Sequence, residues 1–310
     1  MNACPIGLVS LIIRSMDRAT LREALDSVAL QTYDNVEVVL VNARGGVHRN
    51  FGDHCGRFPV RIVNQGGIPL SRPQAANAGL DAARGQYLAF LDDDDTLDPD
   101  HLSSLVEAIQ AEVEPAVVYA GVRCMDRSDS ERRISRTFGE PLESVAQLLA
   151  GNFIPIHAPL FPSRLLKYAR VDEALEAYED WDFWLQLTQH ARFVYTHRVT
   201  ATYFTGGSSS VSPQAPDWDA VRIASRALFA KWMRIAPDEF RKICDLYHGA
   251  AAEVKSSRQE IARLELALAE SQLQNELSAL KLQQTYSSTS WSLTKPLRQL
   301  KTLTRQLLKR

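Results

Sequence analysis

Short apolar runs alternate with amphipathic segments along the first 125 residues. Five runs rich in Val, Ile, Leu and Ala predict buried strands, at 7–13, 36–41, 60–63, 87–91 and 116–122. Helical spacing appears between them, in segments that begin at Thr20, Pro73 and Asp98. Because strand and helix alternate, this part of the chain predicts an α/β fold with a mostly parallel sheet and helices on both faces.

The expected helix ends carry three local signals. Thr20 and Glu23 have the spacing of a capping box. Asp98 followed by Pro99 predicts the start of a helix, with Asp as the N-cap. Gly85 follows an Ala-rich helical segment, where a C-cap requires a residue that can adopt positive φ.

The second half of the chain is irregular at first and then strongly helical. An extended stretch covers 193–204, and an amphipathic helix is predicted at 217–234. From 237 to about 284 the composition predicts a long helix. Its leucines fall in two rows that do not join in one heptad frame, so we expect coiled-coil pairing into a homo-oligomer without a preferred number of helices.

Charge is segregated along the chain. The 310 residues contain 35 basic and 37 acidic residues, a net charge of −2. Residues 291–310 hold six basic residues and no acidic one, which leaves a net charge of −8 on residues 1–290. Leucines at helical spacing among those basic residues predict a basic amphipathic helix that docks on a membrane surface or a partner protein. Packing on the rest of the chain and self-association are the alternatives, and the acidic remainder argues against nucleic acid.

Cysteine usage and hydropathy indicate a cytoplasmic location. The four cysteines are far apart, which argues against a zinc site and a disulfide framework. No stretch approaches the roughly 20 apolar residues of a spanning helix, and the run at 6–13 reads as a strand rather than a signal peptide. We therefore expect a cytoplasmic protein, peripheral at the inner face of a membrane if the basic segment docks there.

Four consecutive aspartates, Asp92 to Asp95, directly follow the fourth predicted strand. Carboxylates at the carboxyl end of a parallel strand lie where open α/β sheets bind ligands. Their mutual repulsion is relieved by a cation, and oxygen ligands suit Mg²⁺ or Mn²⁺, which in turn suit a diphosphate. The alternative is an acidic loop before a helix N-terminus; the run alone leaves both interpretations open.

Several sequence blocks together resemble the family-2 glycosyltransferases with the GT-A fold. They are 9–13, 21–33, 75–80, 83–95 and 179–185, in the order and spacing of that family over about residues 7–205. The resemblance implies an inverting, metal-dependent transfer of a hexosyl or related sugar from a nucleotide-diphosphate sugar to an acceptor hydroxyl.

The resemblance also implies roles for individual residues. Asp92-x-Asp94 matches the Asp-x-Asp motif, with Asp94 as the first metal ligand and Asp92 and Asp95 beside it. Asp180 matches the general base; the N-cap of a helix beginning at Trp181 is the alternative. The remaining candidates divide into a donor group, Ser15, Asp17, Asn42, Arg72, Asp92 and Asp93, and an acceptor-pocket group, Glu179, Trp181 and Trp184.

Three positions depart from the family pattern. Asn42-Ala43-Arg44 stands in place of the usual Asp pair that recognises the base, and Arg44 is a candidate phosphate contact. The common Pro-Thr-Tyr-Asn is Arg14-Ser15-Met16-Asp17 here. Residues 203–206 lack the frequent Tyr-Arg-x-His, which leaves His157 and His197 as candidate metal ligands, with a structural role as the alternative for each.

The segment 288–298 resembles a short motif that follows coiled coils in bacterial surface-polysaccharide enzymes. This resemblance implies a role in O-antigen, capsule or exopolysaccharide assembly, with sugar transfer to a saccharide or lipid-linked acceptor. We therefore expect a GT-A domain at 1–235, a long helix at 236–286 and a basic tail at 287–310. The competing hypothesis is a non-catalytic GT-A module that scaffolds polysaccharide-assembly proteins through its helical tail.

Overall fold

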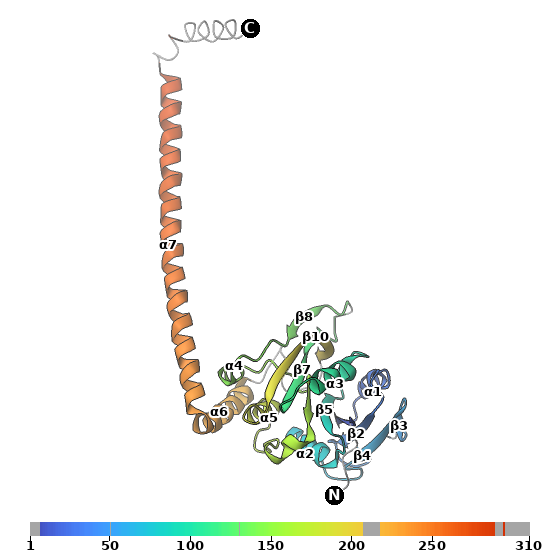
Figure 1. Cartoon of the computed structure of the whole chain (residues 1–310). Helices are drawn as coiled ribbons and strands as arrows, with labels where there is room; N and C mark the ends of the chain where they lie inside the picture. The colour runs from blue at the N-terminus through green and yellow to red at the C-terminus, as the bar shows by residue number, and fades with distance from the viewer. Residues whose placement is uncertain (1–6, 50, 130, 207–217, 289–293, 295–310) are drawn as a thin grey trace. The chain divides into compact units, whose positions relative to one another are not determined.

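The computed structural model describes residues 7–49, 51–129, 131–206, 218–288 and 294 (Figure 1). The chain divides into two compact units, Met1–Ile243 and Cys244–Arg310. The first unit contains the sheet, its helices and the candidate site, and the second contains most of the long helix α7.

The first unit is built on a mixed sheet. Its strands among the described residues are β1 (Val9–Ser15), β2 (Val36–Asn42), β3 (His54–Cys55), β4 (Phe58–Val63), β5 (Tyr87–Asp92), β6 (Thr96–Leu97), β7 (Ala116–Asp126), β8 (Ile134–Phe138), β9 (Pro159–Pro162) and β10 (Arg192–Thr205). They run in the order β3-β4-β2-β1-β5-β9-β7-β10-β6, with β8 beside β7. β4, β2, β1 and β5 are parallel neighbours, and β9 lies antiparallel between β5 and β7. The expectation of a mostly parallel α/β sheet is therefore confirmed.

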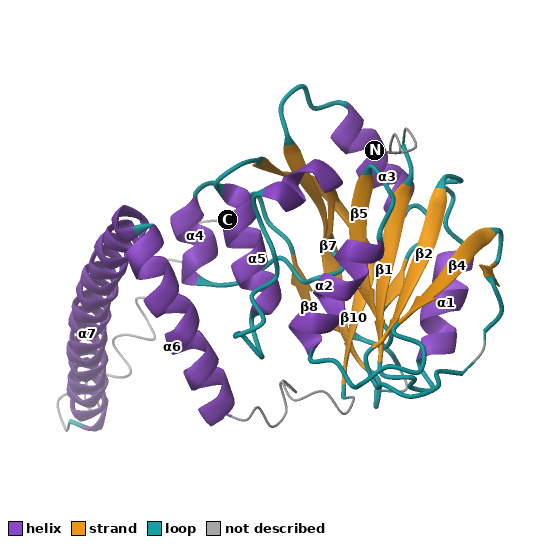
Figure 2. Ribbon diagram, turned by 90° about the horizontal axis from the view of Figure 1, so that it is seen from below, coloured by secondary structure: helices purple, strands orange, loops and turns teal. Residues whose placement is uncertain are grey.

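Helices flank the strands on both faces of the sheet (Figure 2). The helices before α7 are α1 (Leu21–Ala29), α2 (Arg72–Ala82), α3 (His101–Gln110), α4 (Val145–Ala150), α5 (Glu179–Thr188) and α6 (Trp218–Ile235), with a 3-10 turn at Ser163–Lys167. Of these, α4 and α6 pack against α5. The Gln31 side chain joins α1 to α3, because it donates to the carbonyl of Asp98 and accepts from the amide of Leu102. On the other face, Asn77 of α2 makes two hydrogen bonds to the backbone of Val171, in the loop that leads to α5.

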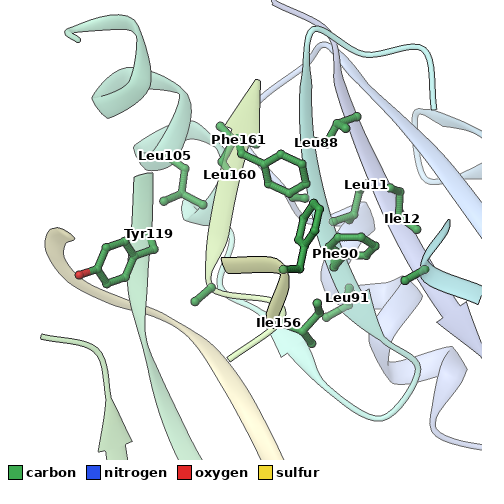
Figure 3. Packing of buried hydrophobic residues seen from close by; sticks show 14 of the residues in the cluster. Leu11, Ile12, Leu88, Phe90, Leu91, Leu105, Tyr119, Ile156, Leu160 and Phe161 are labelled. Atoms are coloured by element: carbon green, nitrogen blue, oxygen red, sulfur yellow. The ribbon is translucent and has the colours of Figure 1, made fainter. Parts of the chain in front are cut away.

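Aromatic packing fixes α5 against the sheet. Phe90 of β5 and Phe161 of β9 are fully buried with ring centroids 6.2 Å apart (Figure 3). Phe161 in turn contacts Phe183 and Trp184 of α5, at 5.6 and 5.9 Å. Edge-to-face contacts of this kind add to the free energy gained by burial. The N-terminus of α5 is therefore held at a fixed place beside the end of β5.

Two of the predicted helix starts are wrong in detail. Thr20 makes no side-chain capping hydrogen bond, and Glu23 pairs instead with Arg127. α3 begins at His101 rather than after Asp98, whose carboxylate pairs with Arg123. A capping box does form at α2, where Ser71 and Gln74 exchange hydrogen bonds.

Gly85 is required for a reason other than the predicted one. Its φ is not positive, and α2 has already ended at Ala82. A Cβ at this position would lie 2.6 Å from the amide nitrogen of Ser10 and 2.7 Å from the carbonyl oxygen of Tyr87. The glycine lets the chain pass directly against the start of β1.

The predicted helices of the second half are present. α6 covers Trp218–Ile235 and α7 covers Pro237–Ser287. Leu264, Leu273 and Leu280 of α7 are more than half exposed, and coiled-coil pairing stays a prediction. The predicted basic helix at 291–310 lies outside the described residues except for Thr294. None of the helices that the structure describes has the length and apolar character to cross a membrane.

We expect Gly85→Ala to destabilise the protein by about 1–3 kcal/mol, because the new Cβ overlaps backbone atoms that cannot move independently. Chemical denaturation measures the change. Gly151→Ala is the matched control, since its φ of −179° is extended and a Cβ there would meet no atom within 4 Å. Equal stability of the two variants would contradict this account of Gly85.

Candidate active site

The carboxyl ends of three parallel strands bring the candidate site together. Ser15 of β1 is in register with Asn42 of β2, and Arg14 of β1 is in register with Asp92 of β5. Since side chains of adjacent parallel strands lie side by side, the strand ends alone place these polar groups at one edge of the sheet. The acidic run 92–95 continues from that edge.

A cavity of about 500 Å³ opens at this edge. Its polar lining includes half of the twelve predicted site residues, Arg72, Asp92, Asp93, Asp94, Glu179 and Asp180, together with Arg14, Arg18, Asn152, His157, Tyr178 and Tyr203. Donor and acceptor candidates that are far apart in the sequence therefore share one cavity. Ser15, Asp17, Asn42, Asp95, Trp181 and Trp184 are not among the lining residues.

Arg14 lies between the two acidic groups of the cavity. Its Nε and Nη2 donate to the two carboxylate oxygens of Asp92, at 2.7 and 2.8 Å, and its Nη1 donates to Oε1 of Glu179 at 2.8 Å. Burial alone would lower the pKa of Arg14, but Asp92 and Glu179 hold it above the ordinary value. Burial likewise tends to raise the pKa of Asp92, and Arg14 holds it below its usual range. Sequence reasoning gave Arg14 no role; the signal was a charged residue at the end of an otherwise apolar strand.

Arg18 neutralises the middle of the acidic run. One of its guanidinium nitrogens donates to Asp93 at 2.8 Å and to Asp94 at 3.0 Å. Asp93 also accepts hydrogen bonds from the Ser15 hydroxyl and the amide of Met16. Burial, and then the neighbouring charge of Asp92, raise the pKa of Asp94. Asp93 is therefore a structural anchor of the first loop, and Asp94 is the more available carboxylate.

Asp95 and His157 contain buried polar atoms without hydrogen-bond partners among the described residues. Asp95 Oδ1 accepts from the amide of Phe204, but its Oδ2 and both ring nitrogens of His157 are unsatisfied. Oδ2 and Nδ1 lie 3.4 Å apart without hydrogen-bond alignment. Burial lowers the pKa of His157 to about 4, so the imidazole is neutral at physiological pH.

These groups fit a divalent cation. Ligand atoms of Asp92, Asp94 and Asp95 all lie within 4.8 Å of one another. Bonds of about 2.1 Å hold two ligands of one ion about 3.0–3.4 Å apart, which matches the separation of the orphaned atoms of Asp95 and His157. Because Arg14 occupies both oxygens of Asp92, Asp94 and Asp95 are the better ligands. His197 lies on an exposed, irregular part of β10 and does not line the cavity.

Asp180 faces the same cavity from the first turn of α5. The helix begins at Glu179 after Tyr178, whose φ of 63° turns the chain into it, so Asp180 is not the N-cap. Burial and the adjacent Glu179 raise the pKa of Asp180 to about 7. Its Oδ1 accepts from the amide of Trp181, and Asn152 lies 3.4 Å from its Oδ2. Among the lining carboxylates that the structure describes, Asp180 has no ion-pair partner.

Trp181 and Trp184 belong to the core, not to the cavity wall. Trp184 is fully buried and its indole donates to the carbonyl of Ile154. The Trp181 indole donates to the carbonyl of Leu148. Both satisfy their single polar group on the backbone while their rings pack inward, as buried tryptophans usually do. The prediction that these two tryptophans line the acceptor pocket is therefore corrected. Tyr178, Ile156 and Tyr203 line the cavity instead.

The other donor candidates lie at the end of β1, in the loop that follows it and at the end of β2. Asp17, with a φ of 56°, is enclosed by Arg44 at 3.1 Å and Arg49 at 2.6 Å. The Ser15 hydroxyl is within 2.9 Å of His48 Nε2. The Asn42 amide donates to the carbonyl of Gly46, which leaves its buried Oδ1 as an unsatisfied acceptor in the described structure.

The sheet order and the carboxylates at its edge define the GT-A class of glycosyltransferases. The chain belongs to glycosyl transferase family 2, whose sequence pattern matches residues 10–164. A glycosyltransferase of Haemophilus influenzae is 28% identical over 208 residues, which cover 64% of this chain and 68% of that protein. EpsH of Bacillus subtilis, also named a glycosyltransferase, is 32% identical over 104 residues, 32% of this chain and 29% of its own.

Solved structures with the same fold include TarS of S. aureus. TarS 1–349 in complex with UDP-GlcNAc has a TM-score of 0.53 and 16% identity over 73% of this chain and 66% of that one. A second TarS structure, of which this chain covers 40%, has a TM-score of 0.52. At this identity the likeness shows the fold. The family membership establishes that the protein is a glycosyltransferase.

We expect Lys231→Met to destabilise the first unit by about 2–4 kcal/mol. Lys231 of α6 donates to Asp172 at 2.6 Å and to the fully buried Asp182 of α5 at 2.8 Å. Removing the ammonium leaves a buried carboxylate with Trp232 and Gln186 as its remaining side-chain donors. Thermal and urea unfolding measure the effect. Arg241→Met, at an exposed pair with Asp238, is the control, and a loss no larger than in that control would contradict the buried-pair argument.

Proposed function

We propose that this glycosyltransferase transfers a hexosyl or related sugar, with inversion, from a nucleotide-diphosphate sugar to a saccharide or lipid-linked acceptor. The proposal depends on one observation: an unpaired carboxylate with a raised pKa, Asp180, shares a cavity with the carboxylates that follow β5. The same cavity therefore carries groups for a diphosphate and its cation and a carboxylate that can act as a base.

Asp180 acts as the general base. The acceptor hydroxyl is a weak nucleophile, so a carboxylate within hydrogen-bond reach takes its proton as the oxygen attacks the anomeric carbon. The new C–O bond forms as the bond from the anomeric carbon to the diphosphate breaks, and the electron pair leaves with the nucleoside diphosphate. Glu179, the carboxylate next to Asp180, is held by Arg14, so among the described residues it is not free to form a covalent intermediate beside Asp180. Direct displacement with inversion follows.

The donor side combines basic groups with a cation site. Arg72 and Arg18 line the cavity and face the charge that develops on the leaving group. Asp94 and Asp95, with His157 beside them, would hold Mg²⁺ or Mn²⁺, which supplies Lewis-acid stabilisation of the leaving diphosphate when bound. The TarS relatives bind UDP and UDP-GlcNAc, which supports a nucleotide-sugar donor for this chain too.

The pathway we propose is assembly of bacterial surface polysaccharide, such as O-antigen, capsule or exopolysaccharide. The support is the resemblance of residues 288–298 to segments of such enzymes. The basic tail at 287–310 would dock on the cytoplasmic face of the inner membrane or on assembly proteins, and α7 would pair into a homo-oligomer.

The pH profile tests Asp180. Its carboxylate works as a base only when deprotonated, so with a pKa of about 7 we expect kcat/KM to rise with a slope near one up to about pH 7 and then to level. Asp180→Asn should lower kcat by about 10²–10⁴. Release of nucleoside diphosphate from UDP-glucose, UDP-GlcNAc or GDP-mannose measures both. Asp26→Asn, at an exposed pair with Arg22, is the control; full activity of Asp180→Asn would refute the assignment.

Thermal unfolding with a panel of nucleoside diphosphates, with and without Mn²⁺, tests the donor site. We expect one nucleoside diphosphate with Mn²⁺ to raise the Tm, because a ligand that binds only the folded state stabilises it. Asp94→Asn should lose the Mn²⁺-dependent part of the shift, while Asp180→Asn and Asp26→Asn keep it. No shift with any nucleotide in the wild type would favour the non-catalytic module instead.

A further inference from the structure

Arg14 is placed to connect the two halves of the cavity. It is the residue of β1 that is in register with Asp92 of β5, and it also reaches Glu179, the first residue of α5. Its side chain is 6% exposed, and that of Glu179 is 3% exposed. Thus a single guanidinium spans the strand edge that carries the donor carboxylates and the helix that carries Asp180.

Arg14 binds Asp92 through both sides of a bidentate contact, with one N–H group on each carboxylate oxygen. Two parallel N–H···O bonds to one carboxylate fix both the distance and the plane of the pair, which a lysine ammonium cannot do. The third contact, from Nη1 to Glu179, uses a different edge of the same planar group. Asp92 and Glu179 are therefore held at a fixed separation by a rigid spacer.

Arg72 does not provide the same connection. Its Nε lies 3.7 Å from Oε1 of Glu179, beyond hydrogen-bond distance, and its side chain is 36% exposed. Among the described residues, the ion-pair partner of Asp92 is Arg14 and not Arg72. Arg72 is thus free to face a ligand in the cavity, whereas Arg14 has its guanidinium occupied by protein carboxylates.

We propose that Arg14 is a positioning residue that sets the distance between the donor site and the base. It holds the first turn of α5 through Glu179 against Asp92, so that Asp180 meets the acceptor hydroxyl in line with a donor bound at the strand edge. The inference rests on the proposed function, because it assigns Asp180 as the base.

Kinetics of Arg14 variants test the proposal. We expect Arg14→Gln to lower kcat by about 10², the cost of a displacement near 1 Å at the reacting atoms, and to change the donor KM only a few-fold. Arg14→Lys keeps the charge without the fork and should lower kcat about tenfold. Arg22→Gln, at an exposed arginine of α1, is the control. Nucleoside diphosphate release from the donor that the wild type cleaves is the assay, with kcat expressed per folded molecule.

A double variant separates positioning from a structural role. If Arg14 acts through the base, Arg14→Gln lowers kcat in the wild-type background but causes little further loss in Asp180→Asn, since effects on one step are not additive. If the fold-losses in kcat of the two single variants multiply in the double variant, the proposal is overturned. A wild-type kcat in Arg14→Lys or Arg14→Gln would overturn it too. Should Arg14→Gln fail to fold, Arg14→Lys decides alone. Full activity of Asp180→Asn would instead overturn the proposed function, so the two failures are distinguishable.

Discussion

The parallel register of β1, β2 and β5 is the constraint from which the site follows. It brings Arg14 beside Asp92 and Ser15 beside Asn42 at one edge of the sheet. Once this edge is fixed, β9 and the aromatic cluster around Phe161 determine where α5 can lie. The catalytic candidate on α5 thus acquires its position from hydrophobic packing, although its chemistry is polar.

Charge balance then decides which carboxylate remains reactive. The edge and the start of α5 together bring six acidic side chains, Asp92–Asp95, Glu179 and Asp180, into a half-buried region. Arg14 and Arg18 each form ion pairs with two of them. Asp95 is buried beside neutral His157, and its pKa is well above the ordinary value because of burial. Asp180 is left with a raised pKa and an open face, the combination that a base at neutral pH requires.

Much of the fold was predictable because strands and helices alternate with clear periods, and because the acidic run ends a strand. The contacts of individual side chains were not. The sequence pattern could not show that Arg14 reaches Glu179, since 165 residues separate them. It also misplaced Trp181 and Trp184, because the aromatic residues next to a catalytic motif lie on the core-facing side of α5. The capping signal at Thr20 failed because a local pattern is overridden when Glu23 finds Arg127.

At the positions that depart from the family pattern, the candidate site has polar groups from other residues. Where the family pattern has proline, Arg14 supplies a buried positive charge, which pairs with Asp92 and Glu179 and holds the pKa of Asp92 below its usual range. Where the Tyr-Arg-x-His segment is missing, His157 approaches the acidic run from the loop before β9 and offers neutral ring nitrogens. Asn42 retains a buried acceptor oxygen at the position of the usual aspartate. Each departure still leaves a polar group at the same edge of the sheet, because the backbone of the parallel strands, rather than any one side chain, defines that edge.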